Sequence, residues 1–99
     1  MNAVQLIGRL TADPEAKEAQ SGRRLTKMRL AVPRREKEAG AVFVDVVAWG
    51  PLGEACARHL TRGREVAVAG RLEVDEWLDS EGKRRTRPGV VADQVEFLR

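Results

Sequence analysis

The chain has few of the residues that build disulfide-linked, metal-bound or membrane-spanning proteins. It contains one cysteine, Cys56, and one histidine, His59. An intramolecular disulfide and a cysteine-based zinc site are therefore both excluded. No stretch approaches the roughly 18 consecutive apolar residues that a membrane span requires, and the N-terminus lacks the pattern of a signal peptide. We expect a soluble, cytoplasmic protein, with Cys56 as a small apolar helix residue.

The sequence also lacks the patterns that mark common catalytic centres. It has no phosphate-binding glycine loop, no nucleophile paired with a base, and no cluster of metal ligands. His59 has no partner that could make it a catalytic base. We expect it to be a structural residue on the apolar side of a helix, near the C-terminal end of that helix, where the helix dipole favours a cation. We expect no enzymatic activity, no cofactor and no metal.

Aromatic residues are rare, and charged residues are abundant. The 99 residues include four aromatics and no tyrosine, whereas 33% are charged, with a net charge of +3. Arginine outnumbers lysine 14 to 4, which favours planar contacts with phosphates and bases. The pI near 9.6 is compatible with a polyanionic partner and does not prove one.

Two of the four aromatic residues lie in a single predicted strand, residues 41–49. With a period of two, one face of the strand carries Val42, Val44, Val46 and Ala48, and the other carries Phe43, Asp45, Val47 and Trp49. The first face alone provides enough apolar surface for a core. Rings on the second face indicate a surface that stacks on a planar partner, for which single-stranded nucleic acid is the first candidate.

The order of predicted elements indicates the fold class. We expect strands over residues 3–10, 24–33, 41–49, 64–77 and 83–98, with a short helix from Gly50-Pro51 to Gly63, a loop over residues 11–23 and a hairpin turn at residues 79–82. Three strands, one helix and two strands is the order of the OB-fold, an all-β, five-stranded Greek-key barrel with one helix between strands three and four. An SH3-like barrel also has five strands, but it would not normally place a full helix there. Residues 1–99 are expected to form one such domain.

Alternation also predicts which side chains face the core. The expected inward residues are Val4, Leu6, Leu10, Met28, Leu30, Val32, Val66, Val68, Leu72 and Val74, and on the last strand Val91, Val95 and Phe97 share one face. Gly8 interrupts the first strand, as happens where two backbones approach closely.

A set of short motifs then resembles a known family. The segments are Asn2, Leu6-Ile7-Gly8-Arg9-Leu10, Asp13-Pro14-Glu15, Ser21-Gly22, Leu30-Ala31, Val46-Val47-Ala48-Trp49-Gly50, Leu52-Gly53-Glu54, Gly70-Arg71-Leu72, Trp77 and Val90-Val91-Ala92-Asp93. In order and spacing this set is similar to bacterial single-stranded DNA-binding proteins, over essentially the whole chain.

The resemblance implies a function and a set of partners. Such proteins form homo-oligomers, usually tetramers and sometimes dimers, and bind single-stranded DNA without sequence preference in replication, recombination and repair. The resemblance also implies replication and repair proteins as further partners. The family stacks bases on rings that correspond here to Phe43, Trp49 and Trp77. Phe43 and Trp49 could instead be core or oligomer-interface residues, and Trp77 could pack against a partner subunit or the base of its own hairpin.

We expect the DNA backbone to be bound by cations near those rings. The candidates are Lys27, Arg29, Arg34, Arg35, Arg71, Lys83, Arg84 and Arg85. Asp45 is expected to pair with Lys27 or Arg29 of the neighbouring strand. In the last hairpin, a register with Leu78 opposite Lys83 and Glu76 opposite Arg85 would pair acids with bases and neutralise part of the positive charge.

Three departures from the family pattern leave a second function open. The connection that begins at Arg34 has no aromatic ring, the arm before Trp77 is acidic, and the chain stops at Arg99 without an acidic tail. An OB-fold adaptor of the primosomal replication-restart type, acting mainly through protein partners, is the alternative. A coating protein would bind long single strands tightly and contiguously, whereas an adaptor would bind modestly and need its partner.

Overall fold

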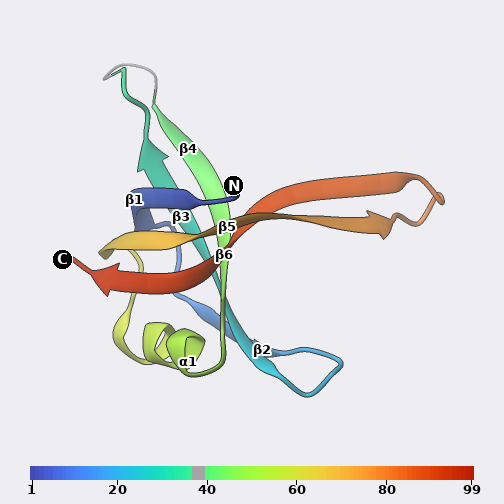
Figure 1. Ribbon diagram of the computed structural model, residues 1–99, viewed down its shortest axis with the longest axis horizontal. Coiled ribbons are helices and arrows are strands. Elements are labelled where there is room, and N and C mark those ends of the chain that lie inside the picture. The colour runs from blue at the N-terminus through green and yellow to red at the C-terminus, as the bar shows by residue number, and fades with distance from the viewer. Residues whose placement is uncertain (37–39) are drawn as a thin grey trace.

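Five strands close into a barrel in the computed structural model, which describes residues 1–36 and 40–99 (Figure 1). The elements are β1 (Val4–Leu10), β2 (Glu15–Glu18), β3 (Arg24–Pro33), β4 (Ala41–Trp49), α1 (Gly50–His59), β5 (Glu65–Leu78) and β6 (Arg84–Phe97). The ring runs β1-β5-β6-β4-β3 and closes by pairing β3 with β1. Its pairs are antiparallel except for β4–β6, which is parallel. The expected OB-fold, with its helix between the third and fourth strands of the barrel, is confirmed.

The short strand β2 was not predicted, because residues 11–23 read as a loop. Glu15–Glu18 pairs antiparallel with the first part of β3, from Glu15 opposite Lys27 to Glu18 opposite Arg24. All four residues of β2 are exposed, so the strand has no apolar alternation that a sequence could display. It forms through backbone hydrogen bonds to β3, and the two strands make a hairpin whose loop projects from the barrel (Figure 1).

The barrel interior is apolar and is covered at one end by α1. Its buried apolar residues are Leu10, Met28, Leu30, Val46, Ala48, Val66, Val68, Val90 and Ala92 from the strands, with Cys56 and Leu60 from the helix region. Burial raises the pKa of the Cys56 thiol to about 11, because the thiolate would lose its hydration. Cys56 is thus the small apolar helix residue that was expected.

Two close contacts between backbones hold the layers together. A Cβ atom on Gly53 of α1 would lie 2.3 Å from the Ala48 carbonyl oxygen, and the Thr26 hydroxyl donates a 2.8 Å hydrogen bond to the Gly53 carbonyl. A Cβ atom on Gly8 would lie 2.7 Å from the Ala31 carbonyl oxygen, which confirms the close approach predicted there. His59 differs from expectation: it is exposed, and its ring centroid lies 6.2 Å from that of Phe97.

A β-bulge changes which residues of β6 face the core. Val90 and Ala92 are buried, whereas Val91, which was expected to share a face with Val95, is not. Gly70 pairs with Ala92 and Ala69 pairs with Gln94, so Asp93 has no partner in the register. The extra residue shifts the alternation by one position, and the prediction from uniform alternation was wrong for Val91.

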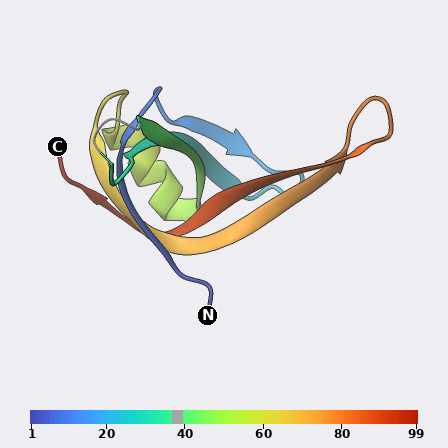
Figure 2. The same ribbon diagram turned by 90° about the horizontal axis from the view of Figure 1, so that it is seen from above.

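Beyond the bulge and the junction with β4, β5 and β6 leave the barrel as a two-stranded arm, residues 72–89 (Figure 2). Leu72 and Val74, predicted to face inward, are 47% and 52% exposed. They keep the inward parity of the strand, but no layer of the chain covers them.

The helix α1 has 10 residues, and none of the described residues form a helix long and apolar enough to cross a membrane.

The turn at the end of the arm lies at the predicted residues 79–82. The Asp79 carboxylate accepts hydrogen bonds from the backbone N–H groups of Glu81 and Lys83, and Gly82 has φ +78°. The strand register differs from the expected one by a residue. Leu78 lies opposite Arg84 and Trp77 lies opposite Arg85, because the turn holds Lys83 in a hydrogen bond to Asp79 at its base.

Candidate nucleic-acid interface

The outer face of β3 and β4 and one face of the arm enclose a groove of about 420 Å³. Trp49 and Val47 line it from β4, and Lys27 and Arg29 line it from β3. The arm contributes Arg87 together with the carboxylates Glu73 and Asp75, and the remaining acidic residues of the lining are Asp13, Glu15 and Asp45. The groove therefore contains an aromatic ring and both signs of charge.

The three candidate rings differ in exposure. Phe43 is 58% exposed and Trp77 is 44% exposed, whereas Trp49 is only partly accessible. Phe43 and Trp49 lie on the outer face of β4, opposite the buried Val46 and Ala48. Phe43 and Trp77 are therefore not core residues of this chain, and all three rings have surface available to a partner.

An arginine lies against each of the three rings. The guanidinium carbon of Arg23 is 4.5 Å from the Trp49 ring centroid, that of Arg29 is 5.3 Å from Phe43, and that of Arg87 is 5.9 Å from Trp77. These distances are typical of cation–π contacts. The faces of the rings are thus shared with cations of the same chain.

The same strand geometry produces all three contacts. Trp49 lies opposite Leu25, Phe43 opposite Ala31 and Trp77 opposite Arg85. In each case the arginine is two residues from the cross-strand partner, at the diagonal position that long side chains can reach. The sequence prediction missed Arg23 and Arg87. Counting two residues from each ring's partner would have found both, provided that the register was known.

Ion pairs occupy most of the cations of the arm. Arg84 lies 3.6 Å from the Glu76 carboxylate and Arg85 lies 2.9 Å from that of Asp79. The hydrogen bond from the backbone N–H of Lys83, followed by that from Arg85, holds the pKa of Asp79 below its ordinary value. The arm is therefore largely self-neutralised, as the sequence indicated, although through different pairs from those expected.

Asp45 connects the barrel to the arm. It was expected to pair with Lys27 or Arg29, but its carboxylate lies 3.7 Å from Arg87 of β6. Arg29 is directly opposite Asp45 in the register, yet its guanidinium lies over Phe43 instead. The correction has a geometric cause, because the arm brings Arg87 over the outer face of β4.

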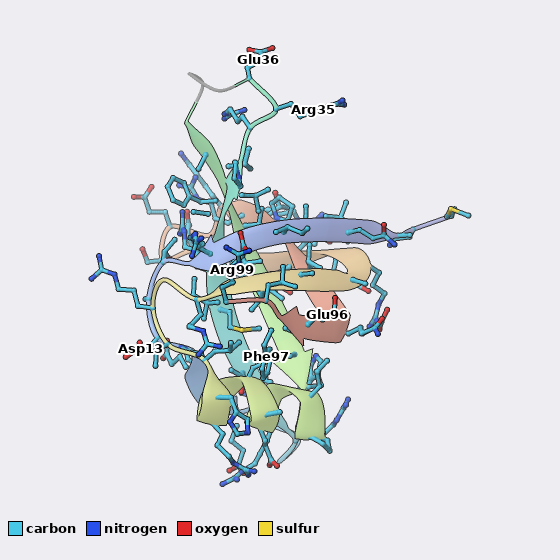
Figure 3. All side chains as sticks on the ribbon, turned by 90° about the vertical axis from the view of Figure 1, so that its left-hand side faces the viewer. Asp13, Arg35, Glu36, Glu96, Phe97 and Arg99 are labelled. Atoms are coloured by element: carbon cyan, nitrogen blue, oxygen red, sulfur yellow. The ribbon has the colours of Figure 1, made fainter. Side chains whose placement is uncertain are left out.

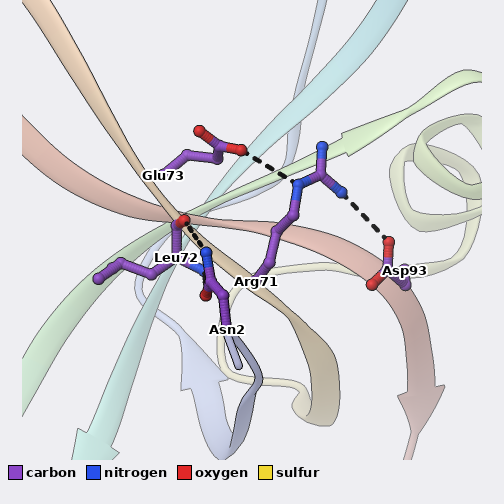
Figure 4. A network of polar contacts seen from close by, with 5 residues as sticks. All are labelled: Asn2, Arg71, Leu72, Glu73 and Asp93. Atoms are coloured by element: carbon purple, nitrogen blue, oxygen red, sulfur yellow. Dashed lines mark hydrogen bonds and ion pairs between the residues drawn. The ribbon is translucent and has the colours of Figure 1, made fainter.

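Arg71 lies in a network of polar contacts at the base of the arm (Figure 4). Its Nε donates to Glu73 at 3.1 Å and its Nη1 donates to Asp93 at 3.5 Å. In the same network the Asn2 amide donates to the Leu72 carbonyl and accepts from the Leu72 N–H. Arg71 is thus engaged by two carboxylates, and it is outside the groove lining.

The other expected phosphate ligands are separated from the groove. Arg34 and Arg35 line a different hollow with Val42, and Arg35 extends from the connection between β3 and β4, away from the barrel (Figure 3). Lys83 belongs to the turn of the arm. Part of the charged connection that was expected between β3 and β4, residues 37–39, lies outside the described residues. Of the eight predicted cations, only Lys27 and Arg29 line the groove with Trp49.

The comparisons with known proteins identify the family of this barrel. The model of the single-strand binding protein family matches residues 1–98. The chain belongs to this family. Relatives named single-stranded DNA-binding protein include one from Clostridium perfringens, 39% identical over 99% of this chain and 66% of its own length. One from Clostridium tetani is 41% identical over 99% of this chain and 70% of its own length.

The chain spans about two thirds of the length of these relatives. Single-stranded DNA-binding protein 1 of Clostridium acetobutylicum is 37% identical, and the match covers 99% of this chain and 94% of that protein. The family consists of DNA-binding proteins and is non-enzymatic, in agreement with the expectation that the chain is not an enzyme. The resemblance inferred from the motifs is confirmed.

Proposed function

We propose that this chain binds single-stranded DNA without sequence preference, through one OB-fold domain over residues 1–99. The observation that carries the proposal is the groove of about 420 Å³ in which Trp49 lies beside Lys27 and Arg29. A ring beside cations can stack on a base while the cations neutralise its phosphates. The names of the relatives support this assignment.

Binding would combine stacking and charge neutralisation. Trp49, Phe43 and Trp77 stack on unpaired bases, and each stack contributes about 1–3 kcal/mol. Lys27 and Arg29 bind phosphates along the groove. Arg34, Arg35, Arg71, Lys83, Arg84 and Arg85 extend the backbone path outside it, where several must exchange a carboxylate for a phosphate. Because every base has a π face, this mechanism discriminates single strands from duplex and not one sequence from another.

The proposed role is in DNA replication, recombination and repair, in the cytoplasm near the nucleoid. We propose that the chain acts as a homo-oligomer, most simply a tetramer with a dimer as second choice, and that replication or repair proteins are further partners. Sedimentation with and without oligo-dT measures the assembly state and binding together. A single species of monomer mass in both runs would contradict the oligomer.

The stacking role is tested by removing each tryptophan. Trp49→Ala and Trp77→Ala should each weaken oligo-dT binding by about 1–3 kcal/mol, because each removes one base stack. Fluorescence anisotropy of labelled oligo-dT measures the affinity, and thermal unfolding checks that the variants are folded. Phe97→Leu is the matched control, since it removes an aromatic ring that lies outside the groove. Normal binding by both tryptophan variants would disprove the stacking mechanism.

The five carboxylates of the groove favour one second candidate, the adaptor protein. Asp13, Glu15, Asp45, Glu73 and Asp75 repel phosphates, and a weakened DNA site suits a protein that acts through protein partners. Competition with a long oligo-dT separates the two functions. Tight, contiguous coverage of the strand supports the coating protein, whereas modest binding that increases with a partner protein supports the adaptor.

A further inference from the structure

We propose that Trp49 and Phe43 each form an exchange pair with their diagonal arginines, Arg23 and Arg29. In the free protein the guanidinium occupies the ring face, and on binding a base displaces it, so that the arginine then binds an adjacent phosphate. This inference rests on the proposed single-stranded DNA binding and deepens it. The pair Arg23–Trp49 shows the geometry most clearly, with 4.5 Å between guanidinium carbon and ring centroid.

The contacts at Trp49 and Phe43 share a geometry that β3 and β4 impose, and the contact at Trp77 uses the opposite diagonal. Every ring has its arginine two residues from its cross-strand partner, in β3 or just before it for Trp49 and Phe43 and in β6 for Trp77. From this diagonal position one side chain reaches the neighbouring ring face and also the space beside it. A nucleotide stacked on the ring would place its phosphate within reach of the same side chain.

The alternative partners of the arginines decide how easily each pair exchanges. Within residues 1–36 and 40–99, neither Arg23 nor Arg29 forms an ion pair with a carboxylate. Only the cation–π contact then holds each guanidinium, and at exposed sites such a contact is weaker than the stack of a base on an aromatic ring. Arg87 differs, because Asp45 holds it at 3.7 Å as well. Arg23 and Arg29 therefore exchange readily, and Arg87 is retained.

The exchange couples base stacking on the ring to phosphate binding by the arginine, at one nucleotide. A base that stacks on Trp49 releases the cation that neutralises its own phosphate. In the alternative arrangement Arg23 stays on the ring and the base stacks on the guanidinium. Base stacking and phosphate binding would then be coupled with the opposite sign. The sign of the coupling between Arg23 and Trp49 therefore distinguishes the two arrangements.

A double-mutant cycle on oligo-dT binding measures this sign. The variants are Arg23→Ala, Trp49→Leu and both together. Leucine keeps apolar volume at this partly buried position, so the protein folds without the π face. If the pair exchanges, Arg23→Ala weakens binding about two- to fivefold more in the Trp49→Leu background than in wild type. In wild type Arg23 must give up its cation–π contact before it binds the phosphate, whereas in Trp49→Leu it has no such contact to lose. An equal or smaller effect in that background overturns the proposal.

Tryptophan fluorescence gives a second readout that does not depend on affinity. Trp77→Phe leaves Trp49 as the sole tryptophan. In this background, Arg23→Ala should change the Trp49 emission of the free protein, because it removes a cation from the ring face. With saturating oligo-dT the two emission spectra should coincide, since the base has replaced the guanidinium. A difference that persists in the complex means that Arg23 stays on the ring and overturns the exchange.

Arg24 provides the matched control. It is the next residue, but its guanidinium lies 3.7 Å from Glu54 of α1 and not over a ring. Arg24→Ala should show no coupling to Trp49→Leu, and equal coupling for both arginines would contradict the specific pairing. The two proposals can fail separately. If wild-type protein does not bind oligo-dT, both are disproved. If it binds normally but Arg23 and Trp49 show no coupling, the exchange alone is disproved.

Discussion

At the scale of single residues, Asp45 combines two opposing effects on the groove. Its carboxylate lies among the groove cations, where it repels phosphate, and it also holds Arg87 of the arm at 3.7 Å. Arg87 in turn contacts the ring of Trp77. One carboxylate thus influences the charge of the groove and the position of a candidate stacking ring.

Replacing this carboxylate should strengthen DNA binding. Asp45→Asn removes a negative charge from the groove and releases Arg87, and exposed charge interactions of this kind contribute roughly 0.2–1 kcal/mol each. We therefore expect about two- to fivefold tighter binding of oligo-dT at low salt, measured by anisotropy. Glu96→Gln makes the same change in charge outside the groove lining, and an equal gain there would show that net charge, not Asp45, is responsible.

At the scale of secondary-structure elements, the bulge in β6 determines where the arm leaves the barrel. A Cβ atom on Gly70, opposite the bulge, would lie 2.1 Å from the Val91 carbonyl oxygen, so only glycine fits without a backbone shift. Gly70→Ala should lower the free energy of unfolding by about 1–3 kcal/mol, measured by urea denaturation. Gly89→Ala, whose Cβ would lie 3.2 Å from the Asp45 carbonyl oxygen, should cost less. The reverse order would contradict this account.

The turn of the arm should respond to acid through Asp79. Hydrogen bonds from the Lys83 N–H, the Arg85 side chain and the Glu81 N–H lower its pKa in the folded protein. A depressed folded pKa means that this stabilisation is present above the unfolded pKa and is lost as the pH falls through the folded value. NMR titration should show the Lys83 and Glu81 amide shifts moving below the ordinary Asp range. In Asp79→Ala this transition should be absent.

The same elements show how far the sequence predicts the fold. Alternation correctly placed Met28 and Leu30 of β3 in the core, because regular strands in a closed barrel obey a period of two. It failed at Val91, because the bulge at Asp93 shifts the alternation and no residue type in the sequence indicates that bulge. It also failed for Leu72 and Val74 of the arm, because burial depends on which layer covers a strand and not on the strand alone.

For the candidate site, the sequence predicted the exposure of the rings better than the contacts of the cations. Because one face of β4 is apolar and forms the core, alternation places the rings on the outer face, and Phe43 is indeed exposed. The partner of a long, flexible arginine depends on the register, which was off by one in the arm. Arg87 was therefore missed. Arg23 lies just before β3, in a stretch that the sequence indicated to be a loop, and Asp45 was assigned the wrong partner because only the fold shows that the arm brings Arg87 over β4.

At the scale of the whole molecule, the positive charge available to DNA is smaller than the composition indicates. Carboxylates engage Arg71, Arg84, Arg85 and Arg87, whereas Lys27, Arg29 and Arg23 form no ion pair within the described part of the chain. At the groove and its rings, two or three phosphates are thus neutralised without breaking an ion pair.

The dependence of binding on salt should reflect this small number. With a slope of about −0.7 per neutralised phosphate, log K against log salt should fall with a slope of roughly −1.4 to −2.1 per barrel on a short oligo-dT. Titrations between about 50 and 200 mM salt measure it. A slope more than twice as steep would mean that the proposed cations outside the groove also bind phosphates.

The closed ring has two short junctions. β1 and β3 pair at Arg9–Ala31 and Leu10–Leu30 alone, and β4 and β6 pair at two positions from Val46 to Val47. By contrast, β3 and β4 pair continuously from Leu25–Trp49 to Pro33–Ala41. Both junctions join segments distant in sequence, and such contacts form late when a chain folds, because closing long loops costs entropy. Amide hydrogens at these junctions should exchange with solvent earlier than those in the middle of β3, so that the barrel divides into the two sheets β1-β5-β6 and β4-β3-β2 before the strands within each sheet separate.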